Sequence, residues 1–373
     1  MFDIDSALRT LVERGGSDLH VKVASPPVIR LHGELLPIEG HGPLRPEDTE
    51  QAFHTISEVR SQTEFEENGE ADFSYAIPDV ARFRVNAFKQ RGSTSIVCRA
   101  IPYGIRSIDE LGLPEVVRTL AEEQRGIVLV TGTTGSGKST TLAAMIDQIN
   151  RTSSRHIVTL EDPIEYLHKD KLSLVNQREV GSDTKSFGRA MRRVLRQDPD
   201  VILIGEMRDE ETVRTALSAA ETGHLVLSTV HTLDATETIN RIIDFFPPYQ
   251  QQQARVMLAG TLRGAIAQRL VPDVTGEGRV AVSEIMVVTG RVQDLILNPE
   301  ETGKITEAIS EGEFYGMRTF DQALLGYVME GRISESVAMD TASSPHDFKL
   351  MLAAKGQRAS GIEQVGEREE QPV

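Results

Sequence analysis

Four short apolar runs recur along the middle of the chain. They are Ile127 to Thr131, His156 to Leu160, Val201 to Ile204 and Leu225 to Val230. Each run has the length of one strand, and stretches of helical length separate them. Because strands that are apolar throughout must be covered on both faces, this pattern predicts a parallel sheet between two layers of helices.

The first hundred residues have a different pattern, typical of a mixed α/β module. Apolar spacing predicts a helix over residues 5–13, and glycines follow it. An extended, apolar-rich stretch over residues 28–38 predicts a hairpin that turns at His32 and Gly33. A second helix is expected to begin at Pro46.

Residues 82–87 alternate between apolar and polar side chains, which predicts a strand with two different faces. The apolar face is expected to pack, while the other face presents the guanidinium groups of Arg82 and Arg84. Residues 96–101 predict the next strand, which carries Arg99.

A change of pattern predicts a domain boundary in the segment 102–114, which contains two prolines and two glycines. We therefore expect an N-terminal domain over residues 1–101, a linker over 102–114 and a second domain over 115–340 that ends in helices. The remaining residues, 341–373, form a polar tail whose end is expected to be disordered.

The composition of the whole chain excludes several classes of protein. A length of 373 residues, with 39% hydrophobic and 26% charged residues, is typical of a folded two-domain protein. The formal net charge of -16 argues against a general surface for polyanions. The single cysteine, Cys98, excludes an internal disulfide and a multi-cysteine zinc site. No apolar stretch is long enough to span a bilayer, so a membrane role would require a partner.

A glycine-rich motif follows the first apolar run and opens a predicted helix over residues 140–149, beginning at Thr140. It fits G-x-x-x-x-G-K-[ST] and consists of Gly132, Thr133, Thr134, Gly135, Ser136, Gly137, Lys138 and Ser139. Glycines let backbone N–H groups close around phosphate oxygens, and a helix N-terminus favours an anion. Lys138 would reach the β and γ phosphates of ATP, and Ser139 would bind Mg²⁺.

Ionisable groups follow the other three runs. Glu161 follows the second, Glu206 follows the third after one glycine, and His231 follows the fourth. Because ligands bind at the carboxyl ends of strands in an open parallel sheet, these three groups are expected to gather around the glycine-rich loop.

Phosphoryl transfer to water assigns a role to each of these groups. Glu161 is expected to orient the attacking water, and Glu206 to hold Mg²⁺ through its water shell. His231 is expected to hydrogen-bond the γ-phosphate. His224 is a weaker candidate for that role, and the alternative for it is a neutral histidine buried by the sheet.

Close to these motifs the sequence contains no obvious arginine that could neutralise negative charge on the γ-phosphate. Arg82, Arg84 and Arg99 belong to predicted strands of the first domain, whose polar faces could meet a nucleotide held by a neighbouring subunit. The alternative is an ordinary solvated strand face.

Together these residues resemble the secretion and pilus ATPases, and within them the PilT-like retraction motors. The resemblance runs from about Gly16 to about Ala338. Besides the glycine-rich loop (Walker A), its motifs occupy residues 82–88, 160–165 (the Asp box), 204–209, 221–232 (the His box) and 316–321.

The resemblance implies a PAS-like N-terminal domain, a RecA-like P-loop ATPase domain and a homohexamer. It implies a cytoplasmic motor that hydrolyses ATP to retract a type IV pilus in twitching motility, acting on an inner-membrane platform protein. It also implies that Glu161 is catalytic, that Glu206 is the Walker B acid and that Arg84 and Arg99 reach the nucleotide. Extension and secretion relatives usually have a longer N-terminal region and a four-cysteine zinc motif, so the sequence fits the retraction branch better.

One segment departs from the resemblance. Retraction motors often carry Ala-Ile-Arg-Asn-Leu-Ile-Arg-Glu after the core, whereas residues 291–298 here replace both arginines, by Gln293 and Leu297. A pilus-assembly or secretion ATPase of the same superfamily therefore stays open as the alternative output.

Two further classes are weighed against a motor. Four arginines at helical spacing could contact nucleic-acid phosphates in a RecA-like translocase, namely Arg189, Arg192, Arg193 and Arg196. The overall acidity and the lack of interleaved aromatic residues favour a solvated face or a subunit contact instead, so nucleic acid is not an expected partner. A regulator that binds ATP without hydrolysing it is disfavoured because Glu161 and Glu206 are both present.

Overall fold

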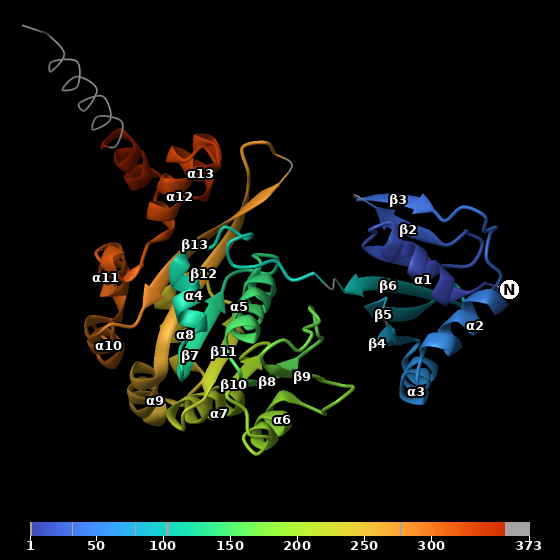
Figure 1. Ribbon diagram of the computed structural model, residues 1–373, viewed down its shortest axis with the longest axis horizontal. Coiled ribbons are helices and arrows are strands. Elements are labelled where there is room, and N and C mark those ends of the chain that lie inside the picture. Colours follow the sequence, from blue (N-terminus) through green and yellow to red (C-terminus); the bar gives the residue numbers. More distant parts are fainter. Residues whose placement is uncertain (1, 32, 79, 102–103, 277, 355–373) are drawn as a thin grey trace, which may run out of the picture. The chain divides into compact units, whose positions relative to one another are not determined.

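A computed structural model of the chain describes residues 2–31, 33–78, 80–101, 104–276 and 278–354 (Figure 1). The chain divides into two compact units. The first contains residues 1–105 with the short segments 162–168 and 179–183, and the second contains the rest. The linker predicted over 102–114 stays a prediction, and residues 102–103 lie outside the described part of the chain.

A six-stranded sheet forms the first unit, and its neighbouring strands pair antiparallel in the order β3-β2-β1-β6-β5-β4. The strands are β1 (Asp18–Val21), β2 (Val28–Leu31), β3 (Glu34–Pro37), β4 (Glu70–Ile77), β5 (Ala81–Gln90) and β6 (Ser93–Ile101). The helices are α1 (Ile4–Glu13), α2 (Pro46–Ile56) and α3 (Val59–Asn68). The predicted first helix, the hairpin and the helix beginning at Pro46 are therefore present, while His32 lies outside the described residues.

Strand β5 has the two faces that its alternation predicts. Phe83, Val85 and Ala87 are fully buried in the core of the first unit. Arg84, between them, is exposed and lies directly opposite Arg99 of β6.

The single cysteine lies on the buried face of the neighbouring strand. Cys98 is fully buried, and desolvation raises the pKa of its thiol to about 12. Because the thiolate is the reactive species, we expect Cys98 of the folded protein to resist a thiol-directed reagent at pH 8 and to react fully after unfolding. With a reagent that releases a chromophore on reaction with a thiol, absorbance measures the extent of labelling. Rapid labelling of the native protein would contradict the burial of Cys98.

The second unit is built on a seven-stranded sheet in the order β13-β12-β7-β11-β10-β8-β9. Its strands are β7 (Gly126–Thr131), β8 (His156–Glu161), β9 (Leu174–Glu179), β10 (Val201–Ile204), β11 (Leu225–Val230), β12 (Leu262–Pro272) and β13 (Arg279–Val287). The five neighbours from β12 to β8 are parallel, and β13 pairs antiparallel with β12. The predicted parallel sheet is confirmed, with an antiparallel strand added at its edge.

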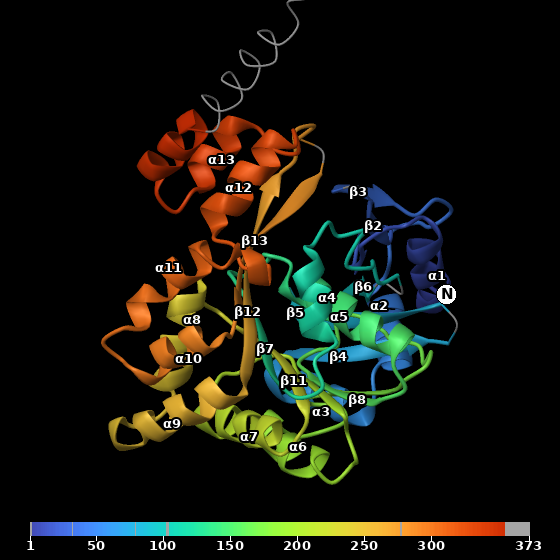
Figure 2. The ribbon, with the colours of Figure 1, turned by 60° about the vertical axis from the view of Figure 1, so that its left-hand side comes forward.

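Two layers of helices cover this sheet (Figure 2). Each strand sends alternate apolar side chains to opposite faces, so both faces need a cover. Val128 and Val130 pack in a core with α4 (Glu115–Ala121) and α5 (Lys138–Thr152). Ile127 and Leu129 pack in the core of the opposite face. That face is covered by α6 (Phe187–Val194), α7 (Glu210–Glu221), α8 (Ala235–Asp244), α9 (Pro248–Thr261), α10 (Gly290–Leu297) and α11 (Ile305–Ser310).

The C-terminal helices pack on the far part of β12 and β13. They are α12 (Phe320–Met329) and α13 (Glu335–Thr341), preceded by the short helices η1 (Thr302–Lys304) and η2 (Glu313–Tyr315). Residues 345–354 are also helical, and Phe348 among them is fully buried in this cluster. The tail predicted to be disordered at its end lies outside the described residues from 355 onward. Within the described residues, no helix combines the length and the apolar character that crossing a bilayer requires.

Candidate functional site

The glycine-rich loop connects the end of β7 to the start of α5, as its sequence context predicts. Gly132 has φ 139°, and a Cβ atom there would lie 2.4 Å from the backbone oxygen of Gln268. Gly137, the residue before the helix, has φ 93°. Both positions require glycine, and together they let the backbone fold into a tight turn at the helix N-terminus.

Lys138 and Ser136 give this turn the features of a phosphate site. Lys138 is buried, and its Nζ donates to the carbonyl oxygens of Gly132 and Thr133, each at 2.9 Å. The hydroxyl of Ser136 is buried without a hydrogen-bond partner among the described residues. A buried ammonium, an unpartnered hydroxyl and the N-terminus of a 15-residue helix fit a bound phosphate group.

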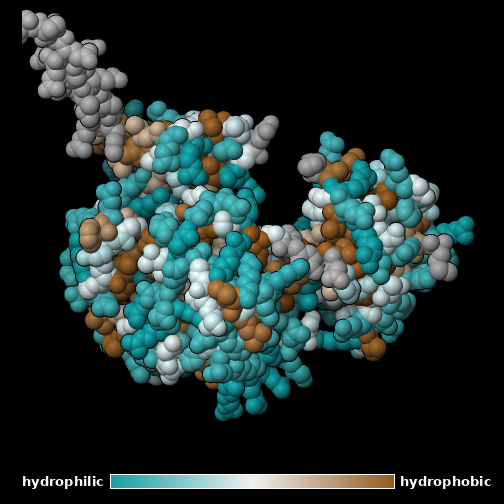
Figure 3. Space-filling model, viewed as in Figure 1, coloured by the Kyte–Doolittle hydropathy of each residue, from teal (hydrophilic) through white to brown (hydrophobic). Residues whose placement is uncertain are grey.

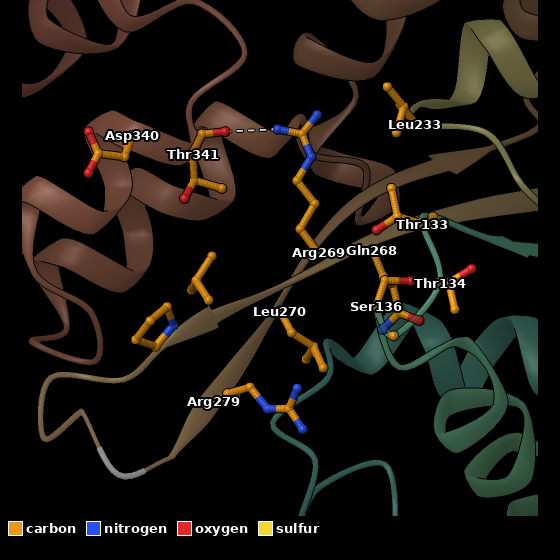
Figure 4. Close-up of a pocket in the computed structure, with 14 residues that line it drawn as sticks. Thr133, Thr134, Ser136, Leu233, Gln268, Arg269, Leu270, Arg279, Asp340 and Thr341 are labelled. Atoms are coloured by element: carbon orange, nitrogen blue, oxygen red, sulfur yellow. Dashed lines mark hydrogen bonds between the residues drawn. The ribbon is translucent and has the colours of Figure 1, made fainter.

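A cavity of about 520 Å³ lies beside the loop (Figure 4). The loop residues 132–136 line it together with residues 268–272 of β12. Leu233 and Arg279 also line it, and Arg269 donates from Nη1 to the carbonyl oxygen of Thr341 at 2.8 Å. The volume lies within the range of about 300–1,000 Å³ that is usual for small-ligand sites.

The register of the sheet places three predicted ionisable groups at the edge where the loop begins. Val230 pairs with Thr131, and Ile204 pairs with Leu160 on one side and Ser228 on the other. Glu161, Glu206 and His231 therefore lie at the carboxyl ends of parallel strands, at the same sheet edge as the glycine-rich loop. The strand before His231 is next to β7, and the strands before Glu206 and Glu161 follow in that order; none of the three residues lines the cavity beside the loop.

Glu206 is in direct contact with two cationic or ionisable partners. Its Oε1 lies 3.3 Å from Nε2 of His231, and its Oε2 accepts a hydrogen bond from Nε of Arg208 at 2.7 Å. The side chain of Glu206 is 20% exposed and that of His231 is 45% exposed. The acid and the imidazole therefore lie in contact with each other, and both are accessible to solvent.

Glu161 ends strand β8 and is half-buried. Its Oε1 accepts hydrogen bonds from Oγ1 of Thr159 at 2.6 Å and from Nε2 of Gln177 at 3.1 Å. These two donors fix the orientation of the carboxylate. A positioned carboxylate at this edge can act as a general base toward a water molecule.

His224 is not brought to this edge. It precedes β11, so it lies at the amino end of the strand, about 20 Å from the carboxyl end at the usual rise per residue. Its ring Nδ1 lies 2.9 Å from the carbonyl oxygen of Ala219 in α7. His224 is half-buried and contacts the last turn of α7, so it is also not the histidine buried by the sheet that the alternative describes.

The residues predicted to hold Mg²⁺ supply few protein ligands. The described residues contain no cluster of three or more His, Cys, Asp or Glu side chains suited to a metal. Ser139 and Thr140, in the first turn of α5, are half-buried. Mg²⁺ usually keeps several waters and binds through one or two protein groups plus phosphates, so Ser139 and Glu206 fit this ion.

The first unit contains the predicted arginines and one residue that the sequence does not single out. Arg99 forms an ion pair with Asp18 at 2.8 Å, whereas Arg84 has no ion pair within the described residues.

Glu179 is the residue that the sequence does not single out. It is buried, and its side chain accepts hydrogen bonds from the hydroxyl of Ser74 and the backbone N–H of Ile164. It also lies 3.3 Å from Arg82. Because Ser182 donates to it as well, this buried glutamate has several partners and ties the segment 162–168 to strands β4 and β5 of the same unit.

The arginine stripe is shorter than its spacing predicts. Helix α6 ends at Val194, so Arg196 lies in the turn beyond it, while Arg189, Arg192 and Arg193 are exposed on the helix. Arg192 forms an ion pair with Glu211 of α7. Figure 3 shows a hydrophilic surface over α6, consistent with the solvated alternative for these arginines.

Comparisons with known proteins agree with this geometry. The family model "Type II/IV secretion system protein" matches residues 69–336. The type IV pilus retraction ATPase PilT of Pseudomonas aeruginosa is 46% identical over 346 residues, which cover 93% of this chain and all of the relative. A twitching motility protein of Neisseria gonorrhoeae is 43% identical, over 94% of this chain and 93% of the relative.

A solved structure adds the fold and a ligand. The crystal structure of a pilus retraction motor PilT with bound ADP superimposes with a TM-score of 0.85 at 44% identity, covering 93% of this chain and 99% of that one. The predicted fold class, an N-terminal α+β domain followed by a P-loop ATPase domain, is thereby confirmed. The roles of the single site residues stay predictions. The chain belongs to the type II/IV secretion system protein family, and it is an ATPase similar to PilT.

Proposed function

We propose that this chain is one subunit of a cytoplasmic homohexamer that hydrolyses ATP with Mg²⁺ to retract a type IV pilus. The observation that carries the ATPase site is the gathering of the glycine-rich loop, Glu161 and the Glu206–His231 contact at one sheet edge. The names of the two relatives, which this chain matches over nearly their whole length, support pilus retraction as the output.

Each residue of the site has a defined task in this proposal. Lys138 exchanges the carbonyl oxygens of Gly132 and Thr133 for phosphate oxygens. Mg²⁺, when bound, neutralises negative charge on the phosphates. Glu161, held by Thr159 and Gln177, orients a water molecule and accepts its proton.

Glu206 and His231 act together in the same site. Glu206 would help to hold the ion through water, and it keeps His231 in place through the contact between Oε1 and Nε2. With Nε2 directed at Glu206, the imidazole can donate a hydrogen bond from Nδ1 to the terminal phosphate when both ring nitrogens carry a proton. Because that bond exists only when the phosphate is present, His231 reports the nucleotide state.

We place Arg84 and Arg99 in the site of a neighbouring subunit. Both side chains are exposed, and they face each other on adjacent strands. Two guanidinium groups at this spacing form a local concentration of positive charge in an otherwise acidic chain. A nucleotide held by the neighbour supplies the complementary anion, which supports a ring in which hydrolysis depends on assembly.

A specific observation favours a second output. Gln293 and Leu297, which replace the two arginines common in retraction motors, are one turn apart on α10 and only partly buried. If this surface transmits force, the loss of two charges favours a different partner, such as an assembly or secretion platform protein at the inner membrane.

Pilus length in a strain that lacks this chain distinguishes the two outputs. We expect the deletion strain to carry long, unretracted pili and to lose twitching motility. Expression of the parent chain restores retraction, whereas a chain carrying Glu161→Gln does not, because the motor then has no energy source. A deletion strain without pili would instead identify an assembly motor, and unchanged pili and motility would contradict both.

A further inference from the structure

Glu284 is a buried carboxylate without a role in the proposed site. It lies on β13, is 5% exposed and accepts a hydrogen bond at Oε1 from the backbone N–H of Ala235 at 2.9 Å. The charged groups that act on it come from three other elements: Arg269 on β12, Asp234 before α8, and Asp321 in α12. A carboxylate kept in such a place, where burial opposes its charge, requires a structural or functional reason.

The partner of Glu284 is the first residue of α8. The turn around it is internally fixed, since Asp234 caps the helix by accepting from the N–H of Glu237 at 2.7 Å. The Glu237 side chain in turn accepts from the N–H of Leu233 at 2.7 Å. The hydroxyl groups of Thr232 and Thr238 are buried and lie 2.7 Å apart. Residues 232–238 therefore behave as one rigid piece, and Glu284 attaches that piece to β13.

The other end of this piece is the catalytic edge of the sheet. Thr232 follows His231, which contacts Glu206, and Leu233 lines the cavity beside the glycine-rich loop. With β11 fixed in the sheet, the position of the first turn of α8 decides where the His231 ring can lie. A shift of that turn would separate His231 from Glu206.

We propose that Glu284 is a positioning residue for ATP hydrolysis, which holds the first turn of α8 on β13 and thereby keeps His231 against Glu206. The proposal rests on the roles proposed above for His231 and Glu206. Glu284 would also link the site to the C-terminal helices, because β13, the strand that contains it, packs against α12.

The pKa of Glu284 reflects its buried place between β13 and α8. Burial raises its pKa to about 7, while the hydrogen bond from Ala235 and the charge of Arg269 act in the opposite direction. The folded state therefore binds the proton more tightly than the unfolded state, whose carboxyl has its ordinary pKa. The stability contributed by the protonated form is present below pH 4.5 and is lost as pH rises toward 7. Removing the charge with Glu284→Gln should therefore raise the melting temperature at pH 8 and leave it nearly unchanged at pH 4.5.

Steady-state kinetics of three variants test the positioning role. Glu284→Ala removes the acceptor for Ala235, and we expect kcat to fall at least about tenfold while KM stays within about twofold, since nucleotide binding is not its task. Glu284→Gln keeps an oxygen acceptor, so kcat should stay within about twofold of the parent. Ser283→Ala is the matched control, because Ser283 is also buried, precedes Glu284 on β13 and accepts a hydrogen bond from Arg318 instead of from α8.

A double variant separates positioning from general destabilisation. His231→Ala alone should lower kcat, and adding Glu284→Ala should lower it no further, because both changes remove the same contact with Glu206. A further drop equal to that of the single Glu284→Ala variant would overturn the proposal. So would a parent kcat in folded Glu284→Ala, or an equal loss in Ser283→Ala.

Amide hydrogen exchange gives a readout that does not depend on activity. We expect residues 232–238 to exchange faster in Glu284→Ala than in the parent and in Ser283→Ala. Unchanged protection there would overturn the attachment itself. If instead His231→Ala keeps the parent kcat while protection responds as expected, the role proposed for His231 fails and the attachment by Glu284 stands.

Discussion

Replacing Glu161 by glutamine is expected to lower ATP turnover by about 10²–10⁴-fold, the usual contribution of a general base. The amide keeps an oxygen that can accept from Thr159 and Gln177, so the side chain stays in place while its charge and basicity are lost. Affinity for ADP should stay within about twofold because Glu161 is not part of the glycine-rich loop. Release of phosphate measures turnover, and a fluorescent ADP analogue measures binding.

Glu165→Gln is the control for this experiment. Glu165 belongs to the same Asp box, but it is exposed and lies four residues beyond the end of the strand. Its turnover should match that of the parent. Parent activity in Glu161→Gln would show that another group accepts the proton and would contradict the catalytic role proposed for Glu161.

The second large effect is expected for Glu206→Gln, which should lower turnover by about 10²-fold or more. The change removes the charge that faces His231 and Arg208, and with it the electrostatic support for a metal ion beside the phosphates. The concentration of Mg²⁺ that gives half-maximal activity should rise. A titration of activity with Mg²⁺ at saturating ATP measures both effects.

Glu210→Gln is a suitable comparison for Glu206→Gln. Glu210 is a partly exposed glutamate four residues further along the chain, paired with Arg214 at 2.6 Å on the first turns of α7. Removing an exposed pair of this kind changes stability by less than about 1 kcal/mol, and turnover should not change. If Glu206→Gln kept the activity and the Mg²⁺ dependence of the parent, the acid would have no part in holding the ion.

The sequence predicts the central sheet well because its strands are buried on both faces. A strand such as β10, Val201–Ile204, has no polar position at all, so both its existence and its bounds follow from the residues alone. The glycine-rich loop is equally predictable, because backbone geometry and phosphate chemistry require particular residues at fixed spacing. The contact between Glu206 and His231 follows in turn from the parallel order of their strands.

Other parts depend on information that a local pattern does not contain. His224 belongs to the same motif as His231, but a strand lies between them, and the direction of that strand places them at opposite edges. The periodicity of the arginines continues to Arg196, although α6 ends before it. Glu179 and Glu284 are isolated acids in the sequence, and their partners are distant in the chain, so only the tertiary structure reveals that both are buried.

The facing pair Arg84 and Arg99 has a consequence for the folded chain on its own. Side chains directly opposite each other on antiparallel strands have Cβ atoms about 4.5–5.5 Å apart, and like charges there repel. Asp18 relieves only one of the two. An anion bound by both guanidinium groups would reduce this repulsion, so the stability of the first unit and its affinity for that anion are thermodynamically linked. If the proposed nucleotide of a neighbouring subunit binds here, it should raise the free energy of unfolding of the first unit.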